Sequence, residues 1–169
     1  MKLEQQVTSL ELSKKLKELG VKQDSLFYWV DKFPLVTIEP IIVDVKKFDN
    51  YYEGKTEDFA RALKNNIYSA FTVAELGNLM PKEIEDTNSE GLKRLFFFDT
   101  WKCNSGFLWR CAYSYYENMN RANTRIEYLK GVDGDIGAET EADCRAKMLI
   151  WLVENGYLQL ESEGQDDNR

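Results

Sequence analysis

The sequence predicts an α+β fold in which a mainly antiparallel sheet packs against helices. Apolar residues alternate with other residues over 107–116, and a denser apolar run precedes them at 92–101. Further segments combine a helix-start signal with apolar residues at helical spacing. We expect a central hairpin at about 92–117 and helices at about 8–20, 72–80 and 140–155.

The hairpin is the clearest strand pair in the sequence. One face of its second strand carries Phe107, Trp109, Cys111, Tyr113 and Tyr115. This alternation predicts a strand with one face on a core. The first strand is apolar on both faces around 96–98, as is typical of a central strand, and the residues 104–106 (Asn-Ser-Gly) supply the turn.

The first two predicted helices begin with the same pattern. Thr8 with Glu11 and Thr72 with Glu75 have capping-box spacing, in which each side chain accepts a backbone N–H at the helix start. An aromatic run follows each helix. A weak internal duplication and chance agreement through shared capping rules both explain this pattern.

The third predicted helix is the longest. Thr140 is its expected N-cap, and Asp143 lies in its first turn. We expect Asp143 to pair with Lys147 on the exposed side, because residues four apart are neighbours on a helix. Gly156 ends the helix.

The remaining segments give weaker signals. Aromatic and branched residues predict a strand over 26–30, and the prolines in 34–45 favour an edge strand or a bent connection. The other expectations are loops at 46–55 and 82–91, a short helix at 57–66, a short strand at 124–129 and a turn at 131–137.

The length of 169 residues is that of one domain. We expect a single α+β domain over 1–160, with a possible insertion at 31–68. Residues 161–169 have the composition of a disordered acidic tail.

Composition excludes several kinds of chemistry. The chain has no histidine, which removes Ser-His and Cys-His nucleophile pairs and the commonest metal ligand. No glycine-rich phosphate loop or cofactor motif is present, so we expect no cofactor, no metal and no catalytic residues. The three cysteines lack metal-ligand spacing, which favours reduced thiols in a cytosolic protein.

Charge and hydropathy bear on partners and location. A net charge of −7 argues against nonspecific binding to nucleic acid. The first residues lack the apolar core of a signal peptide, and no run reaches membrane-spanning length. We therefore expect a cytoplasmic protein, in a host cell if phage-encoded, with no membrane partner.

Three features that could indicate chemistry or ligand binding have simpler explanations. The acids around 133–141 lack the spacing of a calcium loop, and a turn before a charged helix start accounts for them. The acids at 83–90 suit a solvated loop better than acid–base chemistry. The hairpin aromatics could stack on single-stranded nucleic acid, but without a basic surround core packing is favoured.

A second function class concerns residues 9–30, which are similar to the opening of a helix-turn-helix. In a DNA-binding regulator, the element after Gln23 would be a helix in the major groove. Lys22, Gln23 and Ser25 would then contact DNA. The composition of 26–30 favours a strand instead, so the strand and the helix stay open at this point.

Three segments resemble small proteins of phages and prophages: 8–29, the FTVAELGNLMP stretch at 71–81, and the AETEADCRAKMLIWLVENG stretch at 138–156. The order of elements from residue 72 also resembles a phage α-β-α sandwich domain whose late helix carries a Cys-Arg-Ala motif, here at 144–146. The resemblance covers about half of the chain and has no counterpart for 31–68. It implies a viral or prophage origin and a mixed α/β fold, and it carries over no functional residue.

The functional expectation is a non-enzymatic phage or prophage accessory protein that acts through protein–protein contact. Its partner would be a host or phage protein of unknown identity, and its oligomeric state is unknown. The candidate interface residues are Tyr51, Tyr52, Tyr116 and Tyr157, since tyrosines that prove exposed and clustered are typical of interfaces.

Overall fold

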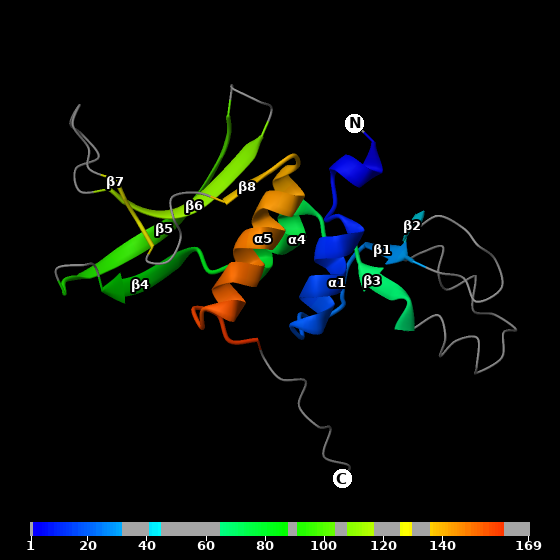
Figure 1. Cartoon of the computed structure of the whole chain (residues 1–169), viewed down its shortest axis with the longest axis horizontal. Helices are drawn as coiled ribbons and strands as arrows, with labels where there is room; N and C mark the ends of the chain where they lie inside the picture. The colour runs from blue at the N-terminus through cyan, green and yellow to red at the C-terminus, as the bar shows by residue number, and fades with distance from the viewer. Residues whose placement is uncertain are drawn as a thin grey trace, which may run out of the picture.

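The computed structural model describes residues 2–31, 41–44, 65–87, 91–103, 108–116, 126–129 and 136–160. They form two antiparallel sheets with helices α1, α4 and α5 between them (Figure 1). The predicted α+β class is therefore confirmed. The sequence led us to expect one sheet, whereas the structure has two.

Three helices make up the middle layer. They are α1 (Leu10–Glu18), α4 (Val73–Leu79) and α5 (Glu141–Glu154), and a 3₁₀ turn at Leu3–Gln5 precedes them. The helix α5 contacts α1, α4 and the larger sheet. Seven of its side chains are buried, which makes it the central element of the core.

The smaller sheet has the order β2-β1-β3. Its strands are β1 (Phe27–Val30), β2 (Ile41–Asp44) and β3 (Ile67–Ser69). The predicted strand at 26–30 is confirmed, and β2, which lies within 34–45, is at the edge of this sheet among the described strands. One face of the sheet lies on α1, where the indole Nε1 of Trp29 donates to the Thr8 carbonyl at 2.7 Å.

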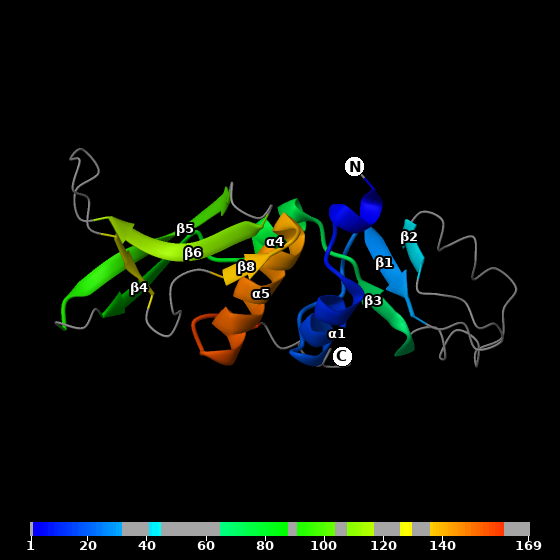
Figure 2. The ribbon, with the colours of Figure 1, turned by 45° about the horizontal axis from the view of Figure 1, so that its top comes forward.

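The larger sheet has the order β4-β5-β6-β7, and β8 also pairs with β6. Its strands are β4 (Glu83–Thr87), β5 (Lys93–Lys102), β6 (Trp109–Tyr116), β7 (Ile126–Tyr128) and β8 (Ile136–Ala138). The predicted hairpin is β5 and β6, with Phe98 opposite Tyr113. Figure 2 shows this pair as a long ribbon on the opposite side of the helices from β1.

The core lies between this ribbon and the helices. Phe96, Cys111 and Tyr113 project from the inner face of the sheet, and Met148 and Leu149 project from α5 to meet them. Each is at most 2% exposed. Burial of apolar area at this interface, at roughly 25 cal/mol per Å², is the main source of stability.

Two predicted loops are strands in the structure. Residues 83–87 form β4 because Ile84 is an apolar residue that can bury under the sheet opposite Phe96. Residues 136–138 form β8 because β6 offers its second edge there, opposite 109–111. Both segments are strands because a neighbouring strand pairs with them, and local composition does not encode which strand a segment pairs with.

The three capping predictions have different outcomes. The Thr72–Glu75 capping box and the Thr140 N-cap are confirmed. The Thr8–Glu11 box is wrong, because α1 begins one residue later with Ser9 as its N-cap. The Thr8 hydroxyl is instead buried, where it bonds the Ser13 hydroxyl at 2.7 Å and accepts the Phe71 N–H at 3.0 Å.

The predicted Asp143–Lys147 pair is also wrong. The carboxylate of Asp143 accepts the backbone N–H of Ser9, and Lys147 donates to the Gly137 carbonyl. Several other expectations lie outside the described residues: the loop at 46–55, the turn at 104–106, the tail at 161–169, and the helix at 57–66 except for its last two residues.

Candidate interaction surface

The edge strand β4 presents backbone groups with no strand beyond them among the described residues. It pairs with β5 alone. The Phe98 N–H donates to the Lys82 carbonyl, and hydrogen-bonded residues alternate along an antiparallel pair. The backbone N–H and C=O groups of Glu83 and Glu85 therefore face away from β5.

Beside this edge, the outer face of the sheet carries exposed apolar side chains. Leu95 is 36% exposed and Phe97 is 40% exposed, and both alternate with the buried Phe96. Leu92, which precedes β5, is 55% exposed. Of the four large apolar side chains exposed in the described part of the chain, Leu95 and Phe97 share this outer face of β5.

We call the outward edge of β4 together with Leu95 and Phe97 the β4–β5 surface. Its edge is acidic, because Glu83 and Glu85 are exposed on the same sheet face as Phe97 and Leu95. Lys93 bonds the Glu85 carboxylate at 2.6 Å, and this hydrogen bond raises the pKa of the Lys93 amine. Apolar side chains, acidic side chains and open backbone groups thus adjoin one another.

Sequence reasoning missed this surface. The run LKRLFFF at 92–98 is apolar on both faces, which suggested a strand covered on both sides. In the structure, helices cover one face, where Phe96 and Phe98 lie, and Phe97 lies on the other. The charged residues on either side of Ile84 were the available sign that 83–87 is an edge strand.

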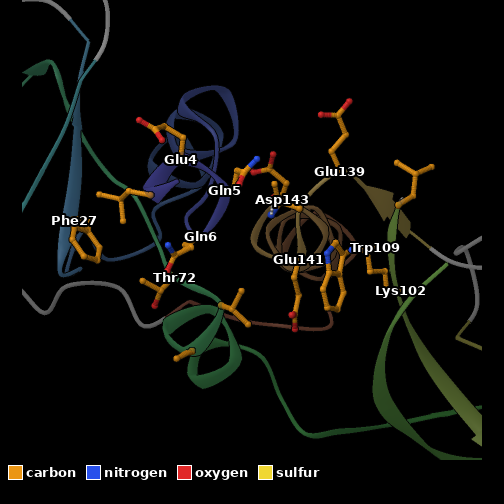
Figure 3. A pocket seen from close by; sticks show the side chains of 15 residues that line it. Glu4, Gln5, Gln6, Phe27, Thr72, Lys102, Trp109, Glu139, Glu141 and Asp143 are labelled. Carbon is orange, nitrogen blue, oxygen red and sulfur yellow. Dashed lines mark hydrogen bonds between the residues drawn. The ribbon is translucent and has the colours of Figure 1, made fainter. Parts of the chain in front are cut away.

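A separate groove of about 980 Å³ lies between the N-terminal 3₁₀ turn, the starts of α4 and α5, and the β5–β6 hairpin (Figure 3). Phe27 and Thr72 line one side, and Lys102 and Trp109 line the other. Its carboxylates come from Glu4, Glu139, Glu141 and Asp143.

These acids are not arranged for acid–base catalysis. Glu141 accepts from the Arg145 guanidinium at 2.6 Å, and Asp143 accepts from the Ser9 N–H at 2.7 Å. Figure 3 shows the side chains of Glu139 and Glu141 pointing in opposite directions. A general acid and base must converge on one reacting group, and these carboxylates do not.

The predicted tyrosine interface is not assembled by the described residues. Tyr51 and Tyr52 lie outside them, as does the side chain of Tyr116. Tyr157 is half-buried, stacks on Trp151 with ring centroids 5.3 Å apart, and donates its hydroxyl to Asp86 at 3.0 Å. Burial and then Asp86 raise the pKa of Tyr157. Its contacts hold the end of α5 against β4.

The residues of the helix-turn-helix alternative serve the fold. Ser25 is buried and donates to the Ala70 carbonyl, while Gln23 accepts the Ser69 N–H at 2.8 Å. Lys22 is exposed and lies 3.7 Å from the Asp24 carboxylate. The element after residue 23 is the strand β1, so the second helix that this alternative needs is not formed.

Two further features are absent from the described residues. These residues contain no helix that is long and apolar enough to span a membrane. Among the same residues, no group of three or more Cys, Asp or Glu side chains is placed to hold a metal ion.

Comparison with known proteins gives no relative. No family model, no curated protein and no solved structure matches the chain. The resemblance to phage and prophage proteins therefore stays an expectation from sequence.

Proposed function

We propose that this protein is a non-enzymatic interaction module that binds an extended, basic segment of a partner protein on the β4–β5 surface. The observation that carries the proposal is the exposed apolar pair Leu95 and Phe97 beside an edge strand with outward backbone groups. Partner strands commonly add to such edges, with affinity from backbone hydrogen bonds and specificity from side chains.

The chemistry of the partner follows from the register. A strand added to β4 would place alternate side chains next to Glu83 and Glu85 on the outer face. Lysine or arginine fits there, because its head group meets the carboxylate of Glu83 or Glu85 on the adjacent strand and its methylene stem covers apolar surface of the sheet. The other side chains would lie next to Ile84, where valine or isoleucine fits.

The alternative functions have less support. No described contact favours DNA binding, because Gln23 and Ser25 are engaged within the fold. Acid–base catalysis has less support because the carboxylates that line the groove do not converge on one point. An origin in a phage or prophage, with a host or phage protein as partner, remains part of the proposal and rests on the sequence resemblance.

The test is a titration with a labelled peptide of alternating lysine and valine, followed by fluorescence anisotropy. Its control is the same peptide methylated on alternate backbone nitrogens, which keeps the charge and removes N–H donors. We expect the first peptide to bind and the methylated one to bind at least about tenfold more weakly. Equal binding of both peptides would refute strand addition.

Variants locate the binding site. We expect Phe97→Ser to weaken binding and the double substitution Glu83→Lys with Glu85→Lys to weaken it by about tenfold or more, through like-charge repulsion. The matched controls are Leu26→Ser, another exposed leucine, and Glu139→Lys, another exposed glutamate. Loss of binding in the controls, or its retention in the surface variants, would place the site elsewhere.

A further inference from the structure

Two cysteine thiols meet inside the core. The Sγ atoms of Cys111 and Cys144 lie 3.1 Å apart. Cys111 is on β6, where it is fully buried, and Cys144 is on α5, where it is 1% exposed. A disulfide bond is about 2.0 Å long, so the two sulfurs need to approach by about 1 Å to form one.

The surrounding contacts hold both thiols in this position. The Cys111 thiol is 3.2 Å from the Cys144 carbonyl, and the Cys144 thiol is 3.1 Å from the Ile136 carbonyl on β8. Both cysteines are on regular elements of the core, with β6 and α5 in direct contact. The pair is therefore positioned by three parts of the fold rather than by a loop.

We propose that Cys111 and Cys144 form a reversible modification site, which hydrogen peroxide converts to a disulfide that ties β6 to α5. Peroxide is small and uncharged, so brief local opening of the core admits it more readily than a peptide disulfide. This site is independent of the β4–β5 surface. It gives the protein two covalent states, distinguished by whether the larger sheet is linked to the central helix.

The chemistry balances with one peroxide per pair. One cysteine, as its thiolate, attacks a peroxide oxygen; the O–O bond breaks, a sulfenic acid forms, and hydroxide leaves and takes up the released proton as water. The second sulfur attacks the sulfenic sulfur, the S–O bond breaks, and water leaves with the second thiol proton. Two thiols are oxidised to one disulfide while peroxide is reduced to two waters.

The test uses the whole chain carrying Cys103→Ser, so that only the pair can react. The protein is treated with peroxide while folded, then denatured and alkylated. Without peroxide both thiols are alkylated; after peroxide we expect no alkylation, a mass lower by two hydrogens, and full recovery with a reducing agent. Thiols that stay alkylatable, or that gain oxygen separately, would overturn the proposal.

Two further measurements keep the test decisive if that variant folds poorly. In the unmodified protein, trypsin releases the three cysteines on separate peptides, 103–110, 111–121 and 131–145, and we expect peroxide to join the last two. The oxidised monomer should also melt about 5 °C or more above the reduced one, a shift absent in Cys111→Ala. A cross-link through residue 103, or between two chains, would contradict the assignment.

Discussion

The backbone N–H of Ser9 donates to the carboxylate of Asp143 at 2.7 Å, across 134 positions of sequence. Ser9 is the N-cap of α1, and its own side chain makes no capping bond. Asp143 therefore places a negative charge at the positive end of α1 while it also lies in the first turn of α5. One carboxylate joins the starts of the first and last helices.

Replacing Asp143 should weaken the whole fold. We expect Asp143→Ala to lower the free energy of unfolding by about 1–3 kcal/mol, because it removes a part-buried hydrogen bond to a charged acceptor. Urea denaturation followed by circular dichroism measures this. The control is Glu139→Ala, an exposed acid nearby, which should change stability by less than about 0.5 kcal/mol. Equal effects of the two variants would exclude the proposed role of Asp143.

Replacing Glu75 should lower the free energy of unfolding more than replacing Thr72, the N-cap of the same capping box. Its carboxylate accepts the Thr72 N–H at 2.7 Å and the Leu26 N–H at 2.8 Å. We expect Glu75→Ala to cost about 3 kcal/mol, because these donors lose their partner. Thr72→Ala should cost about 1 kcal/mol, as usual for an N-cap. Chemical denaturation measures the stability loss of each variant. A larger loss in Thr72→Ala than in Glu75→Ala would disprove this account.

Alkaline pH should destabilise the fold through Tyr113. Burial, and secondarily Cys111, raise its pKa above the ordinary value of 10.0. The unfolded chain then loses the Tyr113 proton first. The stability from this group is complete below pH 10 and falls as pH rises beyond it, by up to about 1.4 kcal/mol per pH unit.

Tyr113→Phe tests this pH dependence. The variant loses the hydroxyl that donates to the Pro81 carbonyl, so it should be less stable at neutral pH. Its stability should nevertheless fall less steeply between pH 9 and 11. Part of the fall in stability with pH should remain in the variant, because the pKa values of Lys14 and Tyr157 are also raised. The control is Tyr68→Phe, because the Tyr68 hydroxyl is at the surface. If stability falls as steeply with pH in Tyr113→Phe as in the unmodified protein, Tyr113 is not the origin of the pH dependence.

Local sequence predicted the elements whose signals are local. The helices begin at side chains such as Thr72 and Thr140, whose caps depend on residues three positions away. The β5–β6 hairpin follows from period-two alternation. These features need no knowledge of distant contacts.

Features that depend on distant partners were not predictable in this way. Asp143 was assigned to Lys147, its neighbour on the helix, whereas its partner is Ser9. The division into two sheets depends on pairing between remote segments. The strand β4 is a different case: its partner β5 follows directly, but the acids at 83–90 predict a solvated loop. The β4–β5 surface was missed because composition does not say which face of β5 the helices cover.

The most direct test of the proposed function is residue-resolved amide hydrogen exchange in β4, measured by NMR with and without the lysine–valine peptide. The amides of Glu83 and Glu85 face outward, while those of Ile84 and Asp86 face β5. We predict that the peptide slows exchange at Glu83 and Glu85 and leaves Ile84 and Asp86 nearly unchanged. Bound peptide without added protection at Glu83 and Glu85 would contradict strand addition at this edge.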